Sequence, residues 1–366
     1  MNTVIDFFLS PFKFEGTKLH PNILLMCKML VYLMMAHHLF FKISDPFIPF
    51  IPVLDHFNTY PNVFKYLMRA TFAISVFALI FNIRVRTASV IIGLVVIINI
   101  LASKPLFFNH TLICGCALFL AGLTNDKDPP YLLIYQLSLV YFGASINKFL
   151  DVDWWTGAFM DTWLGIARDN PVYRLFADLL PSMVLAKLLS YIAMFTEFAI
   201  AITILFKRTR LLTVWFIIIF HTLLFTITSF RFGHFIESLA IVLLAFLNMP
   251  KEQMIIHLRA GAYNYLKSIF LFFDRDGKQQ WLSMDKTESS WIKLTYGNKT
   301  LTNHLAIKEL MLYTPNFFIT LMILDMGSYV ILYEYRTILF LLNVIVVWTL
   351  IFYFFPFHRR KSRPLP

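Results

Sequence analysis

The sequence predicts an all-α polytopic membrane helix bundle of about ten spans with a small α+β cytoplasmic insert. Three observations support this prediction. Of the 366 residues, 58% are hydrophobic and only 14% are charged, whereas a soluble domain has about 25% charged residues. Mean hydropathy is +0.68. Apolar runs of roughly 18 to 25 residues, long enough to cross a hydrocarbon core of about 30 Å, recur along the chain.

The apolar runs give the expected order of the spans. They lie at about residues 23–43, 63–83, 87–103, 106–124, 131–150, 182–206, 211–230, 235–249, 316–333 and 337–356. The first run is too long for the hydrophobic part of a cleavable signal peptide, so we expect an uncleaved signal anchor. The Pro-rich stretch 45–55 should be extended rather than helical.

Lys and Arg residues set the expected orientation, because they are retained on the cytoplasmic side. Arg84, Arg86, the turn 207–210 and the tail 358–363 fall on one side when ten spans are counted. Both termini are then cytoplasmic, and the net charge of +11 is mostly a topology signal. Basic residues do not gather on a soluble face, so the expected partner is the lipid bilayer and not nucleic acid.

Composition divides the chain into an expected transmembrane domain (1–249), a small cytoplasmic insert (250–315) and a C-terminal transmembrane hairpin with a basic tail (316–366). In the insert, residues 268–273 and 279–283 are predicted strands. They join at 274–277, Asp-Arg-Asp-Gly, which is a strong turn signal. A helix near 303–312 follows, stopped by Pro315.

The most informative stretch is 141–157, an apolar helix that ends on a lysine and leaves through an acidic, Trp-rich exit. Tyr141, Ser145 and Lys148 are spaced by four and three residues, so they share one helix face. An unpaired ammonium among apolar neighbours costs several kcal/mol, which makes Lys148 a candidate functional residue. The alternative is a snorkelling lysine that anchors the helix end at the interface.

These residues resemble a known family, the horizontally transferred transmembrane (HTTM) family, which includes vitamin K-dependent gamma-carboxylase. The likeness covers roughly residues 15–250, and the stretch 141–157 is its most specific part. Asn109-His110 and Phe220-His221 resemble two further family motifs. Glu197 stands where the eukaryotic carboxylase has an aspartate.

The resemblance implies an enzyme that uses a reduced quinone, either vitamin K hydroquinone or menaquinol. Lys148 corresponds to the base that deprotonates the quinol, and His110 to a histidine of the proton-abstraction and carboxylation half. Such an enzyme is a carboxylase-like lyase or quinol oxidase, and its acceptor is a secreted Glu-containing peptide or another small acid. A lipophilic quinol would reach the site from the bilayer, and we expect an outward-facing pocket. Residues 151–181 should form a lid over its mouth.

The candidate site follows from the spacing and the resemblance together. The candidate catalytic residues are Lys148, His110, His221 and Tyr141. The expected quinol pocket adds Asn109, Asn147, Trp154, Glu197 and His234. Asp151 and Asp153 are expected either to pair with Lys148, which would make it a poorer base, or to shape the helix exit.

No metal is expected, because the thiols of Cys114 and Cys116 point away from each other on a helix. The third cysteine, Cys27, also falls inside an expected span, and together they suggest no disulfide framework. His37 and His38 are expected to pack between helices, and His221 is equally suited to a structural hydrogen bond with Glu197.

Two departures from the carboxylase keep a second interpretation open. The carboxylase has two adjacent lysines where this chain has Asn147-Lys148, and its large C-terminal region has no counterpart here. A non-catalytic HTTM helper for the maturation or export of a secreted peptide is therefore the alternative, and a bacterial plasma (inner) membrane is the expected location. The insert resembles a degenerate DCC-type thioredoxin-like domain, but no cysteine follows Cys116, so we expect no redox activity there.

Overall fold

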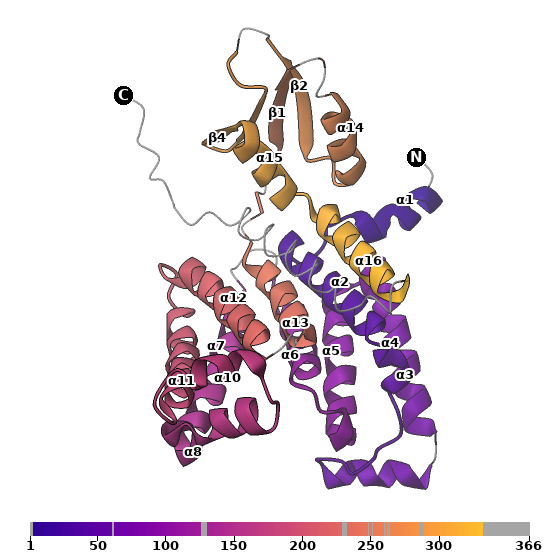
Figure 1. Cartoon of the computed structure of the whole chain (residues 1–366). Helices are drawn as coiled ribbons and strands as arrows, with labels where there is room; N and C mark the ends of the chain where they lie inside the picture. The colour runs from indigo at the N-terminus through magenta and orange to yellow at the C-terminus, as the bar shows by residue number, and fades with distance from the viewer. Residues whose placement is uncertain are drawn as a thin grey trace. The chain divides into compact units, whose positions relative to one another are not determined.

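The computed structural model describes residues 3–60, 62–125, 130–228, 233–247, 249–250, 252–259, 261, 264–285 and 288–331. They form two compact units (Figure 1). The helical unit is Thr17–Leu247, and the sheet unit is Met1–Gly16 together with Asn248–Pro366. The predicted span at 337–356 and the basic tail lie outside the described residues.

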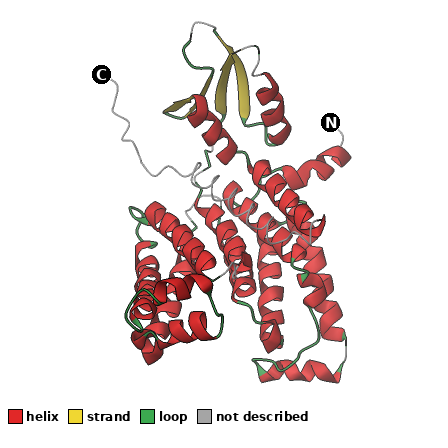
Figure 2. Cartoon of the chain, viewed as in Figure 1, coloured by secondary structure: helices red, strands yellow, loops and turns green. Residues whose placement is uncertain are grey.

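Helices make up nearly all of the helical unit (Figure 2). They are α2 Pro21–Ala36, α3 Leu39–Lys42, η2 Pro52–Thr59, α4 Val63–Ile80, α5 Val85–Ala102, η3 Lys104–Leu106, α6 Asn109–Leu123, α7 Tyr131–Leu150, α8 Val152–Thr156, α9 Ala158–Met160, the π-helix η4 Asp161–Ile166, α10 Pro171–Ala177, α11 Val184–Thr203, α12 Arg210–Ile227, α13 Gly233–Leu243 and η5 Leu244–Phe246. A predominantly helical fold is confirmed. The prediction of an extended Pro-rich stretch at 45–55 is wrong over its last four residues, because Pro52 occupies the first turn of the 3-10 helix Pro52–Thr59, where a missing N–H is tolerated.

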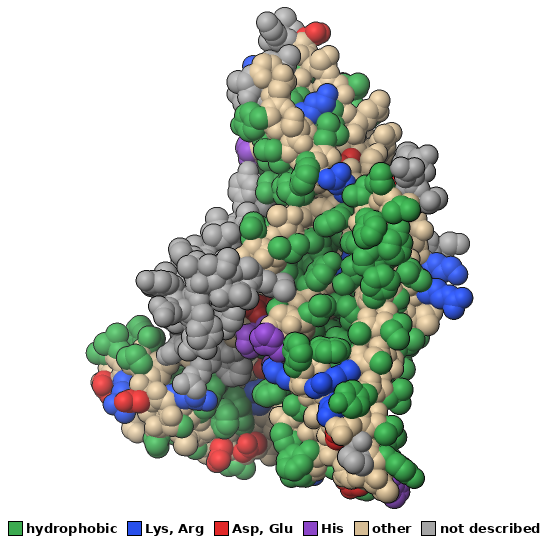
Figure 3. Space-filling view, turned by 90° about the vertical axis from the view of Figure 1, so that its right-hand side faces the viewer, with side chains coloured by type: hydrophobic (Ala, Val, Ile, Leu, Met, Phe, Trp, Pro, Cys, Tyr) green, Lys and Arg blue, Asp and Glu red, His purple; other side chains and the backbone are tan. Residues whose placement is uncertain are grey.

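Large apolar side chains are exposed on the outer faces of the long helices. Ile74 on α4 is 70% exposed, and Leu139 on α7 is 68% exposed. Figure 3 shows such side chains gathered over the helical part of one face. Apolar surface on this scale would be a liability in water, whereas lipid tails solvate it at no cost.

The prediction of about ten spans is not supported. Among the described residues, three helices are long and apolar enough to cross a membrane: α4, α5 and α11. A fourth is counted if α15 (Asn303–Leu312) and the first part of α16 (Pro315–Ile331), which meet at 74°, form one bent span. The apolar helices α2, α6 and α13 and the stretch Arg210–Phe225 of α12 are shorter. At least one predicted span, 23–43, averages over a break between two helices.

The first predicted span, 23–43, contains such a break. Helix α2 ends at Ala36, and His38 adopts the left-handed conformation with φ 59°. The short helix α3 then continues from Leu39. A left-handed residue cannot continue a right-handed helix, so the span divides at His37-His38 and His37 is left at the end of α2.

Helices α5 and α6 pack closely at glycines. A Cβ on Gly93 would lie 2.5 Å from the backbone nitrogen of Phe119, and one on Gly122 would lie 2.5 Å from the carbonyl oxygen of Arg86. The Ser89 hydroxyl donates to the Leu118 carbonyl at 2.6 Å across the same interface. Small residues that allow such close packing are typical of helix pairs in membranes.

Replacing Gly93 with alanine is expected to lower the free energy of unfolding by about 1–3 kcal/mol, because the new methyl group meets backbone atoms that move only if α5 and α6 separate. Gly143→Ala is the matched control, since a Cβ there has no neighbour within 4 Å. Thermal unfolding of the purified protein in detergent measures both. Equal midpoints for the two variants would contradict the close contact.

The sheet unit contains a four-stranded mixed sheet. Its elements are α1 Thr3–Leu9, η1 Ser10–Phe12, β1 Met254–Arg259, α14 Asn264–Phe273, β2 Gln279–Met284, β3 Ile292–Tyr296, β4 Lys299–Thr302, α15 and α16. The strand order is β2-β1-β3-β4. Strand β1 is parallel to β2 and antiparallel to β3, which is antiparallel to β4. Ile256, Phe270, Leu294 and Leu310 are part of the core between the sheet and its helices.

The insert prediction is partly correct. The strand predicted at 279–283 is β2, and the helix predicted at 303–312 is α15. The strand predicted at 268–273 is wrong, because these residues belong to α14. Two parallel strands need a crossover connection, usually a helix, and α14 is the connection between β1 and β2.

The N-terminal segment is attached to the sheet unit through Asp276. Its carboxylate accepts the backbone N–H of Phe14 at 2.9 Å and that of Glu15 at 3.1 Å. Lys278 also forms an ion pair with Glu15 at 2.5 Å. Burial raises the pKa of the Asp276 carboxyl, while the two backbone donors lower it. The turn signal of the sequence thus also supplies the acceptor that holds residues 14 and 15.

Candidate functional site

Lys148 forms a buried ion pair with Glu197. Lys148 lies in the last turn of α7 and Glu197 on α11. The Nζ to Oε2 distance is 2.5 Å, and the two side chains are only 18% and 12% exposed. The ammonium also donates to the Ala144 carbonyl at 3.4 Å and lies over the Trp154 ring at 5.0 Å. The lysine is thus surrounded by protein groups and is not a snorkelling side chain.

Tyr141 and His221 form a second buried pair beside the first. The Tyr141 hydroxyl lies 2.7 Å from the His221 Nε2 atom. Both residues are nearly inaccessible, with Tyr141 3% and His221 6% exposed. Tyr141 comes from the same face of α7 as Lys148, as the spacing predicts, and His221 comes from α12.

The two pairs act on each other electrostatically. The charge of Lys148 interacts with the His221 imidazole, and the charge of Glu197 interacts with the Tyr141 hydroxyl. We refer to Lys148, Glu197, Tyr141 and His221 together as the lysine cluster. It combines an ammonium, a carboxylate, a phenol and an imidazole from three helices, and within each of the two pairs a hydrogen bond joins groups that can exchange a proton.

The lysine cluster lies within the length of α11 and not at its end. Glu197 is 13 residues after Val184 and 6 before Thr203, or about 20 Å and about 9 Å along the helix. Helix α11 extends past the end of α7, and α8 and α9 cover this extension. Tyr191 donates its hydroxyl to the Trp155 carbonyl at 3.0 Å there.

The acidic stretch after α7 caps the next helix, and the partner of Lys148 is Glu197. The Asp151 carboxylate accepts the N–H of Asp153 at 3.0 Å and caps α8. Trp154 is 9% exposed and stacks on Phe159 with ring centroids 4.3 Å apart. Of the two roles left open for the aspartates, the structure shows the capping role for Asp151.

A second polar group gathers around three histidines. The His37 ring lies 4.0 Å from that of His234 and 6.0 Å from that of His110. Glu237 completes the group: its Oε2 atom lies 3.4 Å from His37 Nε2 and 3.2 Å from His234 Nδ1. We refer to His37, His110, His234 and Glu237 as the histidine cluster. It joins the end of α2 and the start of α6 to the first turns of α13.

Comparison with known protein families identifies part of the chain. Residues 129–248 match the model of the HTTM domain. This segment is an HTTM domain. No curated protein and no solved structure matches the chain. The resemblances to gamma-carboxylase and to a thioredoxin-like insert stay predictions.

The HTTM domain contains the whole lysine cluster, from Tyr141 to His221. It also contains His234 and Glu237, whereas His37 and His110 precede it. The ring of Phe235 lies 5.1 Å from that of His221, so the residue next to His234 contacts the lysine cluster. An HTTM domain and several long apolar helices agree with a membrane protein.

The predicted site residues thus divide between two clusters of the HTTM domain and its neighbouring helices. Lys148, Tyr141, His221 and Glu197 come together, with Trp154 beside them. His110 and His234 belong to the histidine cluster. Asn109 and Asn147 are exposed. Asn109 is also not the N-cap of its helix, because α6 begins at Asn109 and Phe108 occupies the cap position.

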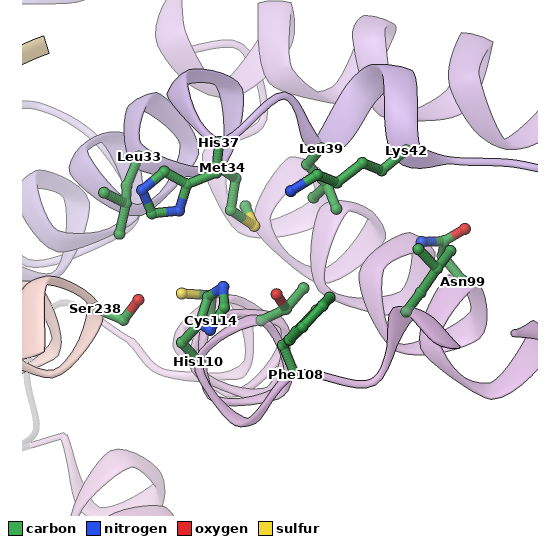
Figure 4. Close-up of a pocket in the computed structure, with 12 residues that line it drawn as sticks. Leu33, Met34, His37, Leu39, Lys42, Asn99, Phe108, His110, Cys114 and Ser238 are labelled. Carbon is green, nitrogen blue, oxygen red and sulfur yellow. The ribbon is translucent and has the colours of Figure 1, made fainter. Parts of the chain in front are cut away.

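A cavity adjoins the histidine cluster (Figure 4). His37 from α2 faces His110 and Cys114 from α6 across it, with Lys42 and Ser238 also in its lining. It has room for about one water molecule. A quinone ring is far larger, so this cavity suits water or an ion.

Sequence reasoning missed two members of the histidine cluster. His37 was expected only to pack between helices, and Glu237 was not singled out. One available signal was the spacing His234-x-x-Glu237, which places both side chains on one face of a helix. The proximity of His37 had no sequence signal, because 197 positions separate it from His234.

Proposed function

We propose that the HTTM domain is a quinol-dependent membrane enzyme whose proton acceptor is the Lys148–Glu197 pair. The single observation that supports this proposal most is the burial of that pair beside the Tyr141–His221 pair. Buried, coupled ionisable groups in a membrane protein are candidates for proton transfer. The resemblance to gamma-carboxylase supplies the substrate class, a reduced quinone such as vitamin K hydroquinone or menaquinol.

The close ion pair changes the expected role of the lysine. As an ammonium, Lys148 cannot accept a proton. Its Nζ lies 2.5 Å from Glu197, so its proton can pass to the carboxylate, leaving a neutral amine beside a neutral acid. In a site of low dielectric the neutral pair competes with the ionic one, because separated charge is poorly solvated there. The free amine then takes the proton of a quinol hydroxyl.

The neighbouring pair provides a second proton site. The Tyr141 hydroxyl and the His221 imidazole share one hydrogen bond of 2.7 Å. A phenol and an imidazole can exchange a proton along such a bond, and the charge of Lys148 acts on the imidazole while that of Glu197 acts on the phenol. In the proposal, this pair carries protons between the amine and the acceptor half of the reaction, where a Glu-containing peptide or other small acid is carboxylated.

The proposed location is a bacterial plasma membrane. The turn between α11 and α12 carries Lys207, Arg208 and Arg210, and the positive-inside rule assigns such short basic turns to the cytoplasm. Along α11, Glu197 would then lie about 9 Å from the cytoplasmic end, while Lys148 lies in the last turn of α7, at the outward end of that helix. A lipid-soluble quinol can reach that depth from the bilayer.

One observation favours a second candidate function. The buried Lys148–Glu197 ion pair can also hold helices together without taking part in a reaction. A non-catalytic HTTM helper for maturation or export of a secreted peptide needs only this structural role. The two functions differ in what Lys148 must do. Substitution at the pair therefore separates them.

The test is quinol turnover by the purified full chain in nanodiscs. Menaquinol or vitamin K hydroquinone is supplied with oxygen and bicarbonate, and quinone epoxide is measured by mass spectrometry. Lys148→Met is expected to lower the rate at least about 100-fold, the usual contribution of a general base. Lys207→Met, an exposed lysine outside the cluster, should retain the wild-type rate.

Two results would overturn the enzyme proposal. One is no epoxide from the wild-type protein with either quinol. The other is full turnover by a folded Lys148→Met variant. Co-purification of a secreted peptide with the wild-type protein, unchanged by Lys148→Met, would then support the helper function.

A further inference from the structure

We infer that His37, His234 and Glu237 form a binding site for one divalent transition-metal ion. The three ligand atoms, two imidazole nitrogens and one carboxylate oxygen, all lie within 4.8 Å of one another. They come from two elements of the helical unit, the end of α2 and the first turns of α13. The site shares no side chain with the lysine cluster, so it does not depend on the proposed function.

The distances fit a metal of the size of zinc. Ligand nitrogens and oxygens lie about 2.0–2.2 Å from Zn²⁺. Two ligands of one tetrahedral ion are therefore about 3.3–3.5 Å apart, and two adjacent ligands of an octahedral ion about 3 Å. The Glu237 Oε2 atom lies 3.4 Å from His37 Nε2 and 3.2 Å from His234 Nδ1. The two imidazole nitrogens lie within 4.8 Å of each other, so they must come up to about 1.5 Å closer to complete the triangle.

Local structure places the ligand atoms. The break at His38, with φ 59°, ends α2 and leaves His37 at its C-terminal cap position. His234 and Glu237 are one helical turn apart on α13, so both side chains project from the same face. The His234 carbonyl accepts the Ser238 hydroxyl at 2.8 Å, so the His234 backbone is fixed within α13.

The ligand chemistry defines the class of ion. Two imidazoles and one carboxylate suit Zn²⁺, Fe²⁺, Co²⁺ and Mn²⁺, whereas Ca²⁺ and Mg²⁺ prefer oxygen ligands alone. Three protein ligands leave a coordination position for water or substrate. His234 is 52% exposed, and the cavity beside His37 has room for about one water molecule. His110, whose ring lies 5.8 Å from that of His234, borders this open side.

A metal-free network is the competing explanation. Both imidazoles can donate a ring N–H to the shared Glu237 oxygen, and these hydrogen bonds would hold α2 against α13 without an ion. Lys42 lines the adjoining cavity, and its ammonium opposes a cation. Metal binding and a hydrogen-bond network make different predictions for binding stoichiometry, so a direct titration decides between them.

The experiment uses the full chain in detergent, purified with a tag that contains no histidine and stripped with a chelator. Co²⁺ is the probe, because its visible d–d absorption reports binding directly. Competition with Zn²⁺ then gives the affinity for Zn²⁺. Elemental analysis of the protein before stripping measures the metal carried from the cell. We expect one ion per chain and an imidazole–carboxylate Co²⁺ spectrum.

Substitutions locate the ion. Glu237→Gln keeps the shape of the side chain and should weaken Co²⁺ binding at least about 100-fold, because losing a ligand costs more than losing a residue that only hydrogen-bonds to a ligand. His234→Gln, at an exposed position, should weaken Co²⁺ binding similarly, and it replaces Glu237→Gln as the test if that variant does not fold. His56→Ala, an exposed histidine on η2, is the control and should bind as the wild type does. Wild-type stoichiometry well below one, or equal affinities for wild type and folded ligand variants, would overturn the metal site.

Discussion

Replacing Glu197 with glutamine is expected to lower the free energy of unfolding of the protein by about 3–5 kcal/mol, because it leaves the Lys148 ammonium buried without its partner. Lys148→Met should have a similar effect, since it leaves the carboxylate unpaired. These magnitudes apply because both side chains are mostly buried, at 18% and 12% exposure. Thermal or denaturant unfolding of the purified variants in the same detergent measures the loss.

The double variant Lys148→Met/Glu197→Gln is the informative control. It removes both charges together, and a buried ion pair replaced by uncharged groups is often neutral in stability. We therefore expect the double variant to be more stable than either single variant, which requires a coupling energy in the double-mutant cycle of at least about 3–5 kcal/mol, the loss of one single variant. Losses below about 1 kcal/mol in both single variants would contradict burial, because that is the range of exposed ion pairs.

Replacing Gly157 with alanine is expected to lower the free energy of unfolding by about 2–5 kcal/mol through two separate effects. Gly157 has φ +82°, a conformation that costs other residues about 1–2 kcal/mol. A Cβ there would also lie 2.7 Å from the Lys187 backbone nitrogen and 3.0 Å from the Ala186 carbonyl carbon, which adds about 1–3 kcal/mol of overpacking. The substitution should separate α8 and α9 from α11.

Hydrogen exchange measured by mass spectrometry checks this result. Exchange should increase in α8 and in the first half of α11 in the Gly157→Ala protein. Gly16→Ala isolates the strain of the backbone, because Gly16 has φ +76° but a Cβ there has no neighbour within 4 Å. Unchanged exchange in α8 and α11 of Gly157→Ala would show that this contact is not tight.

Much of the helical unit is predictable from the sequence, because hydrophobic runs and helix periodicity depend on local residues. Helix α7 has the predicted bounds, and its shared face brings Tyr141 and Lys148 together as expected. The number of membrane spans was not predictable in the same way. Single residues such as His38 divide helices without lowering the mean hydropathy of the window around them.

The position of the lysine cluster along the helices required the structure. Lys148 is two residues from the end of α7, which in sequence places it at the rim of a span. Helix α11 continues past this end and is covered by α8 and α9, so Lys148 meets a carboxylate well inside α11. Sequence reasoning named Glu197 as an acidic position but had no means of pairing it with Lys148, which lies 49 residues away.

In the sheet unit, too, local sequence patterns were not sufficient to predict the structure. The run 268–273, Ser-Ile-Phe-Leu-Phe-Phe, is short and apolar, and such runs are equally compatible with a strand or a buried helix. Tertiary packing favours the helix α14, which places Phe270 in the core. Strands β1, β3 and β4 were not predicted, because their stability comes from pairing with distant strands.

The contact between Asp276 and the backbone of Phe14 has a consequence for the order of biogenesis. The two residues are 262 positions apart, so the acceptor does not exist when the donor leaves the ribosome. At about 5–20 residues per second, translation of the intervening chain takes about 13–50 s. Phe14 and Glu15 therefore cannot make this contact while α2 to α13 are synthesised, and it is among the last contacts of the protein to form.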